Sequence, residues 1–186
     1  MTDPRFPRLV SLACHDLRTP LATVYGFSRT LSRGAELDER TARFLGMIEE
    51  ASEQMTQLLD ELGVLARIEG ERYEPGLREA DTLELATSED ERIEVTGEGA
   101  TVETDPVAVA RALEAFAVAA ARHGAVERVQ WAVKGRELRL SPRNDAAAPI
   151  VLGEELRDLG SAIGRRVVET LGGSIERKGG ALVVRL

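Results

Sequence analysis

The chain has 186 residues, of which 43% are hydrophobic and 30% charged, and its formal net charge at pH 7 is −8. This length fits one or two small domains with a real core, and the acidic balance argues against a nucleic-acid-binding surface. The single cysteine, Cys14, excludes an internal disulfide, and no stretch approaches the 18 consecutive apolar residues of a membrane span.

Residues 1–8 carry charges and two prolines, without the apolar core of a signal peptide. We therefore expect a cytoplasmic protein. The first helix is predicted to begin near Pro4 to Pro7 and to end by Gly34. Its apolar positions recur at alternating steps of four and three residues, with Ser28 in the one polar gap: Val10, Cys14, Leu17, Leu21, Val24 and Leu31. This spacing is the seam of a helix packed in a bundle.

His15 lies one residue past a seam position, so its ring is expected to face water. Thr19, four residues on, shares that exposed face. An unperturbed imidazole, with a pKa of ~6.5, is mostly neutral at pH 7 and therefore nucleophilic. The carboxylate of Asp16 is placed to accept the ring N–H and fix the tautomer, or to act as a base.

A second helix is predicted after a short turn over residues 34–38, with Asp38 as its cap. Its apolar positions repeat the four-and-three spacing: Phe44, Ile48, Ala51, Met55, Leu58, Leu62 and Leu65. The acidic residues on its other face are interpreted as solvated: Glu49, Glu50, Glu53 and Asp60. A hairpin of two such helices buries one face of each, so we expect two hairpins to form a four-helix bundle in a homodimer. The alternative is that the second half of the chain covers the seam.

The periodicity changes after a glycine-bounded linker at residues 70–76, which predicts domains at 1–69 and 70–186. Asp105 and Pro106 are expected to cap and open a helix, and Trp131 is expected in the core. Strands are predicted at 92–95, 100–103, 126–133, 137–140, 174–176 and 181–186, and a last helix at 159–171.

The run His15-Asp16-Leu17-Arg18-Thr19-Pro20-Leu21 closely resembles the phosphoacceptor box of two-component sensor histidine kinases. The resemblance implies that His15 is phosphorylated, that Asp16 assists proton transfer and that Thr19 orients water for dephosphorylating a partner. Sensor kinases usually carry a sensory or membrane segment ahead of this helix; this chain shows none, so its input is expected from another molecule.

The order of elements over residues 72–186 resembles the ATP-binding domain of the same kinases, an α/β sandwich. The resemblance places Ala115 and Ala119 where the family has asparagines that hold Mg²⁺ and phosphates, and a methyl group cannot coordinate a hard cation. In the next box Asp145 is kept, as the residue facing adenine, but both glycines of the segment 145–150 are replaced.

The third box, before the last helix, keeps only Gly160, and Asp158 adds negative charge where the phosphates would lie. No room remains between residues 150 and 159 for the usual nucleotide lid. Asp145 and Gly160 are therefore interpreted as vestiges of a nucleotide site. His123, at the end of the alanine-rich helix, is expected to have a capping or surface role rather than a chemical one.

The sequence thus predicts an α+β protein: a helical hairpin that forms a dimeric four-helix bundle, followed by a degenerate ATPase-like domain. We expect His15 to carry a phosphoryl group to or from the aspartate of a response-regulator receiver domain, and an upstream kinase is a further candidate partner. No cofactor is expected on this chain, and Mg²⁺ is expected on the receiver. The alternatives are an active histidine kinase with an unorthodox ATP site, and a non-catalytic pseudokinase or phosphatase partner.

Overall fold

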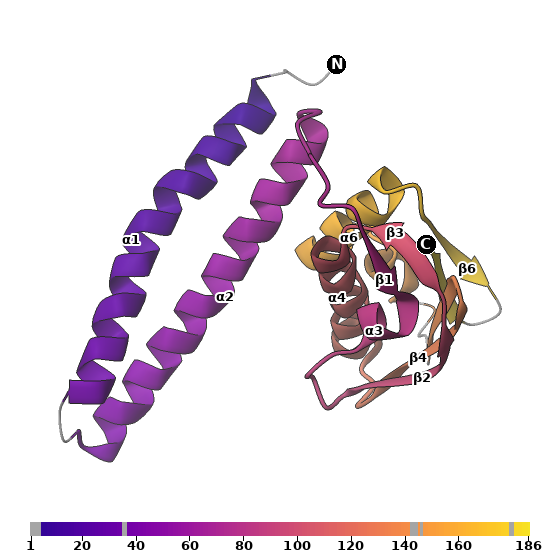
Figure 1. Cartoon of the computed structure of the whole chain (residues 1–186). Helices are drawn as coiled ribbons and strands as arrows, with labels where there is room; N and C mark the ends of the chain where they lie inside the picture. The colour runs from indigo at the N-terminus through magenta and orange to yellow at the C-terminus, as the bar shows by residue number, and fades with distance from the viewer. Residues whose placement is uncertain (1–4, 35–36, 142–144, 146, 179–180) are drawn as a thin grey trace. The chain divides into compact units, whose positions relative to one another are not determined.

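A computed structural model describes residues 5–34, 37–141, 145, 147–178 and 181–186 (Figure 1). The chain divides into two compact units, with the division between Arg72 and Tyr73. The first unit is a helical hairpin, and the second combines a five-stranded sheet with helices.

The hairpin consists of α1 (Phe6–Gly34) and α2 (Glu39–Glu69), which confirms both predicted helices. Asp38 caps α2, because its carboxylate accepts a hydrogen bond from the backbone N–H of Thr41 at 3.1 Å. Within the described residues, neither these helices nor any other has a stretch long and apolar enough to cross a bilayer.

The predicted seam of α1 divides between two faces of the helix. Cys14, Leu21 and Ser28 are buried against α2 at intervals of seven residues. The other members, Leu17, Val24 and Leu31, remain 49–55% exposed, which corrects the expectation of one continuous buried seam. The reason is geometric: one neighbouring helix covers only part of an apolar stripe that is wide enough for two.

Small and polar residues form the contact between the two helices. The buried residues of α2 include Ser52, Gly63 and Ala66, and the hydroxyl of Ser28 donates to the carbonyl oxygen of Leu45 at 3.1 Å. Small side chains allow the two backbones to approach closely. The large apolar side chains of both helices are therefore displaced from this contact to the outer surface of the hairpin.

Polar pairs join α1 and α2 along one edge of the hairpin. Each links residues far apart in sequence: Arg18 with Asp60 (2.7 Å), Tyr25 with Glu53 (2.6 Å) and Ser32 with Glu49 (2.6 Å). The hydrogen bond that Tyr25 donates to Glu53 raises the pKa of the Tyr25 hydroxyl. The acidic face of α2, interpreted from sequence as simply solvated, thus serves to set the register of the hairpin.

The second unit is built on a mixed sheet with strand order β2-β4-β5-β7-β6, beside a two-stranded sheet of β1 and β3. Its strands are β1 (Arg78–Asp81), β2 (Ile93–Gly99), β3 (Thr101–Thr104), β4 (Val129–Gly135), β5 (Glu137–Ser141), β6 (Ser174–Lys178) and β7 (Ala181–Arg185). Its helices are α3 (Thr82–Ala86), α4 (Pro106–Gly124), α5 (Ala148–Val151) and α6 (Leu159–Thr170).

Helices α4 and α6 pack together over one face of the large sheet (Figure 1). Alternate residues of β4 point into this core, and Trp131 is fully buried there, as predicted. The two helices touch almost backbone to backbone, because a Cβ at Gly164 of α6 would lie 3.2 Å from the Cα of Ala112 and the ring of Phe116. Asp105 caps α4 and Pro106 opens it, also as predicted.

The structure differs from the predicted order in its short elements. Strand β1 and the helices α3 and α5 were not predicted, and each has only four or five residues. Strands β2 and β3 do not pair with each other: β2 runs parallel to β4, and β3 runs antiparallel to β1. Gly97, placed between the two strands from sequence, lies inside β2 with a φ of 112° that favours glycine.

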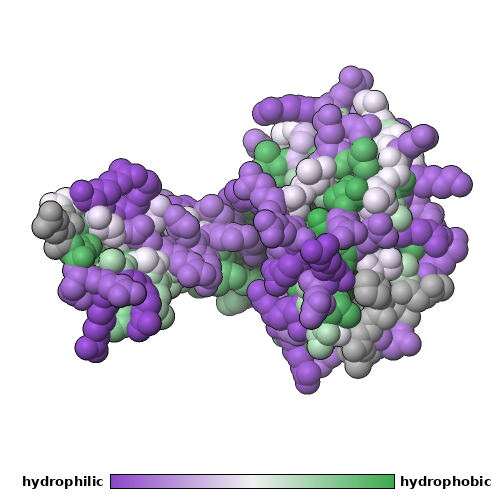
Figure 2. All heavy atoms as spheres, turned by 90° about the horizontal axis from the view of Figure 1, so that it is seen from below, coloured by the Kyte–Doolittle hydropathy of each residue, from purple (hydrophilic) through white to green (hydrophobic). Residues whose placement is uncertain are grey.

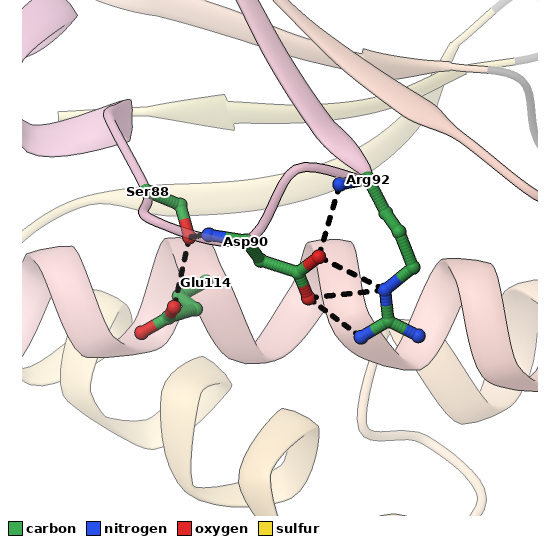
Figure 3. Close-up of polar contacts among 4 residues, drawn as sticks. All are labelled: Ser88, Asp90, Arg92 and Glu114. Atoms are coloured by element: carbon green, nitrogen blue, oxygen red, sulfur yellow. Dashed lines mark hydrogen bonds and ion pairs between the residues drawn. The ribbon is translucent and has the colours of Figure 1, made fainter.

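The connection from α3 to β2 is held on α4 by polar contacts (Figure 3). Ser88 donates to Glu114 of α4 at 2.9 Å and accepts a hydrogen bond from the backbone N–H of Asp90. Asp90 in turn accepts hydrogen bonds from Arg92, which hold the pKa of its carboxyl below the ordinary value. These contacts hold the loop between α3 and β2 in place on α4.

Candidate functional site

His15 stands on the surface of α1 with 76% of its side chain exposed. Its helix neighbour Cys14 is buried against α2, so the one-residue step rotates the imidazole by about 100° away from that contact. At about 100° per residue, the exposed apolar residue Leu17 lies about 160° from His15 around the helix. The histidine therefore lies on neither of these two sides of the helix and faces solvent.

The carboxylate of Asp16 lies beside the imidazole, with 3.1 Å between Asp16 Oδ1 and His15 Nδ1. An ionised carboxylate can only accept a hydrogen bond, so this contact favours the tautomer with its proton on Nδ1. The lone pair then resides on Nε2, the nitrogen farther from the helix backbone. This arrangement prepares Nε2 as the nucleophile.

One turn further along, the site contains Arg18, Thr19 and Pro20. Of the residues three or four positions from His15, only Arg18 is basic, and its guanidinium is held by Asp60 of α2 at 2.7 Å. Thr19 is exposed, four residues after His15. Pro20 lies inside α1 and has no N–H, so it makes no helical hydrogen bond to the carbonyl of Asp16.

The structure thus brings together on one helix face the three residues singled out from sequence: His15, Asp16 and Thr19. Sequence reasoning missed the contribution of Asp60. Arg18 was part of the quoted motif, but its partner is 42 residues away. Only the register of the hairpin identifies that partner.

Among the described residues of the second unit, the two at the expected metal-binding positions do not fit Mg²⁺. Ala119, at a position where the resemblance expects a metal-binding asparagine, is fully buried, and Ala115 is half-buried. Neither methyl group offers an oxygen ligand to Mg²⁺. In addition, α5 contacts α4, and Ala148 and Val151 of α5 are buried.

The first turn of α6, expected to face phosphates, is already occupied by protein groups. The carboxylate of Asp158 accepts from the backbone N–H of Ser161 at 3.0 Å and lies 3.1 Å from Nε2 of His123. Only 8% of the Asp158 side chain is exposed. A Cβ at Gly153 would lie 2.9 Å from the Cα of Ala162, so the preceding loop lies directly on this turn.

The remaining sequence-predicted residues are distributed over this region. Gly160 lies in the first turn of α6, and Asp145 lies on an exposed turn. Ala146, in the same expected box as Asp145, falls outside the described residues. His123 joins the end of α4 to the capping carboxylate of α6, an interhelical role that sequence analysis did not foresee.

Comparison with known proteins finds a matching protein family for the hairpin. Residues 8–71 match the His Kinase A (phospho-acceptor) domain. Sensor histidine kinase TrcS of Mycobacterium tuberculosis is 39% identical over 75 residues, which are 39% of this chain and 15% of TrcS. The chain therefore spans a small part of the length of this relative.

Two solved structures share the fold of nearly the whole chain. Full-length ShkA in complex with AMPPNP matches with a TM-score of 0.65 and 21% identity over 96% of this chain and 44% of ShkA. The histidine kinase AdeS of Acinetobacter baumannii matches with a TM-score of 0.55 and 18% identity over 91% of this chain and 94% of AdeS. At these identities the likeness concerns the fold. The comparisons thus identify residues 8–71, which include His15, as similar to the phospho-acceptor domain of histidine kinases.

Proposed function

We propose that the chain is a dimeric histidine phosphotransferase of two-component signalling. His15 would take a phosphoryl group from the aspartyl phosphate of one receiver domain and pass it to the aspartate of another. The observation that carries this proposal is the exposed imidazole of His15 with the Asp16 carboxylate at Nδ1, inside a phospho-acceptor domain.

The geometry supports a reversible exchange at Nε2. The Nε2 lone pair attacks the phosphorus of the aspartyl phosphate, a P–N bond forms, and the P–O bond to the aspartate breaks to release its carboxylate. The Asp16 carboxylate, which accepts the hydrogen bond from Nδ1–H, stabilises the positive charge left on the ring. The second receiver's carboxylate then attacks the same phosphorus and returns the lone pair to Nε2. Mg²⁺ for both steps is expected on the receiver.

The outer surface of the hairpin supports a dimer. We call the exposed large apolar residues of α2, and those of α1 that lie away from His15, the outer strip: Phe6, Leu9, Leu17, Val24, Phe27 and Leu31 of α1, and Phe44, Met47, Ile48, Met55 and Leu58 of α2. Leu12 is exposed as well but lies only about 60° from His15 around the helix. Hydrophobic side chains are visible among hydrophilic ones at the hairpin surface (Figure 2). Phospho-acceptor domains of histidine kinases are dimeric. A second hairpin would cover the outer strip and complete a four-helix bundle.

The second unit favours phosphotransfer over ATP-dependent autophosphorylation. The alanines of α4 offer no metal ligands, and Asp158 places a carboxylate at the first turn of α6. We therefore expect no measurable affinity for Mg-ATP. Titration calorimetry tests this expectation; micromolar binding would instead favour an active kinase with an unorthodox ATP site.

The function is tested by incubating the purified protein with radiolabelled ATP, first alone and then with a histidine kinase and candidate receivers. We expect label on this chain only when a phosphorylated receiver is present, and none on His15→Gln. Label acquired from ATP alone would support the kinase alternative. Absence of label with every receiver that the kinase phosphorylates would favour a non-catalytic partner.

A further inference from the structure

The segment that joins the hairpin to the second unit is held at its hairpin end by the cap of α2. The backbone N–H groups of Gly70, Glu71 and Arg72 donate to carbonyl oxygens of the last turn of α2 at 3.2, 3.0 and 2.8 Å. Glu71 adopts a left-handed φ of 53°, as is typical of the residue after a helix C-terminus. The hairpin is therefore ordered up to Arg72.

The next residues are held on the second unit by one carboxylate. Asp105 Oδ1 caps α4 by accepting from the N–H of Ala108 at 3.1 Å. Asp105 Oδ2 accepts from the Tyr73 hydroxyl at 2.9 Å and from the N–H of Gly76 at 3.1 Å. Burial raises the pKa of Asp105, but the hydrogen bonds from Ala108, Gly76 and Tyr73 outweigh it, and the pKa stays below its ordinary value.

The backbone between these anchors is itself stiff. Pro75 fixes its own φ and restricts Glu74 to extended conformations. The N–H of Leu77 donates to the carbonyl of Pro75 at 3.0 Å and tightens the turn before β1. Backbone freedom is thus reduced around Pro75, and the position of Tyr73 and Gly76 depends on their contacts with Asp105.

We infer that Asp105, Tyr73 and Gly76 form a strap that fastens the junction to the second unit and limits the motion between the two units. Releasing the strap frees residues 73–77. Five extended residues span up to about 17 Å, so release converts a hinge at the Arg72–Tyr73 junction into a flexible tether. This inference is independent of the phosphotransfer proposal, because it concerns how the units are joined and not what His15 does.

Two substitutions release the strap by different routes. In Asp105→Asn the amide oxygen still accepts from Ala108 and Asn is a good helix cap, whereas the amide nitrogen cannot accept from Tyr73 or Gly76. Tyr73→Phe removes only the hydroxyl. Asp81→Asn is the matched control, because Asp81 caps α3 in the same unit by accepting hydrogen bonds from the backbone N–H groups of Leu83 and Glu84, away from the junction.

The measurements are the rate of trypsin cleavage after Arg72, followed by mass spectrometry, and hydrogen exchange of the Gly76 amide. Loss of one hydrogen bond predicts cleavage about 5-fold faster in Tyr73→Phe, and loss of two predicts a larger increase in Asp105→Asn, with the rate of Asp81→Asn unchanged. We expect the Gly76 amide to be protected in the native chain and to exchange faster in Asp105→Asn.

Circular dichroism checks that each variant retains its helices. If Asp105→Asn unfolds the second unit, Tyr73→Phe alone decides the outcome. The inference is overturned if Gly76 is unprotected in the native chain, or if the folded strap variants are cleaved no faster than Asp81→Asn.

Discussion

His15 is exposed because of its place in the four-and-three spacing of α1. The seam position before it, Cys14, faces α2, and the outer strip runs along the opposite side of the helix. The imidazole is left on the one face that neither α2 nor a second hairpin would cover. The same helix geometry positions Asp16 and Thr19 beside the ring, because Asp16 is the next residue and Thr19 lies four residues, about one turn, further on.

His15→Gln should abolish phosphoryl transfer in both directions, because an amide cannot form the phosphoramidate intermediate. The substitution lies at an exposed position, so the fold should be unaffected. The measurement is the transfer of label between two receiver domains in the presence of the native chain or of His15→Gln. Transfer that persists in His15→Gln would show that His15 is an ordinary surface histidine.

Thr19→Ala should leave transfer largely intact, since Thr19 neither carries nor activates the phosphoryl group. It should slow the loss of phosphate from a phosphorylated receiver, because the hydroxyl is placed to align the attacking water. Thr30→Ala, another exposed threonine of α1, is the control. Dephosphorylation time courses compare the two; abolished transfer in Thr19→Ala would contradict the assigned role.

The helix caps show how single residues determine the elements. Asp38, Asp105 and Asp158 each accept a backbone N–H at the start of a helix. Asp105 and Asp158 also join parts that are distant in sequence, through Tyr73 and His123 respectively. A helix cap can be predicted from sequence because the aspartate bonds an N–H only three residues away. The second oxygen of the same carboxylate can bond a distant residue, and only the packing of the chain determines which one.

The stability of the second unit should depend on pH through Asp105. The pKa of this carboxyl is lowered in the folded state, so its stabilising contribution is present above the unfolded pKa of ~3.9 and is lost as pH falls through the folded value. The difference in urea unfolding between the native chain and Asp105→Asn should therefore be full at pH 7 and shrink as pH falls below the unfolded pKa. A difference that stays constant as pH is lowered would contradict this.

At the scale of the whole molecule, the exposed outer strip calls for a second copy of the hairpin. Leu17→Asp places an unpaired charge in that contact, which costs several kcal/mol and should give a monomer. Ala22→Asp, on an exposed position away from the outer strip, is the matched control and should remain a dimer. Light scattering at micromolar concentration distinguishes them. A monomeric native chain would refute the dimer.

Sequence alone determined the features that arise from local interactions. The two long helices, the caps Asp38 and Asp105, the burial of Trp131 and the exposed histidine all follow from periodicity and short-range hydrogen bonds. The short elements β1, α3 and α5 were missed because four or five residues carry too little periodic signal to be recognised.

Only the tertiary structure decided the features that depend on contacts between residues far apart in sequence. It divided the α1 seam, because small residues such as Ser28 and Ser52 allow close approach of α1 and α2 and leave Leu17 outside. It paired β2 with β4, since strand partners depend on the path of the whole chain. It also brought Arg18 to Asp60 and Tyr73 to Asp105. The partners are 42 and 32 residues apart in sequence, so no local pattern could predict these contacts.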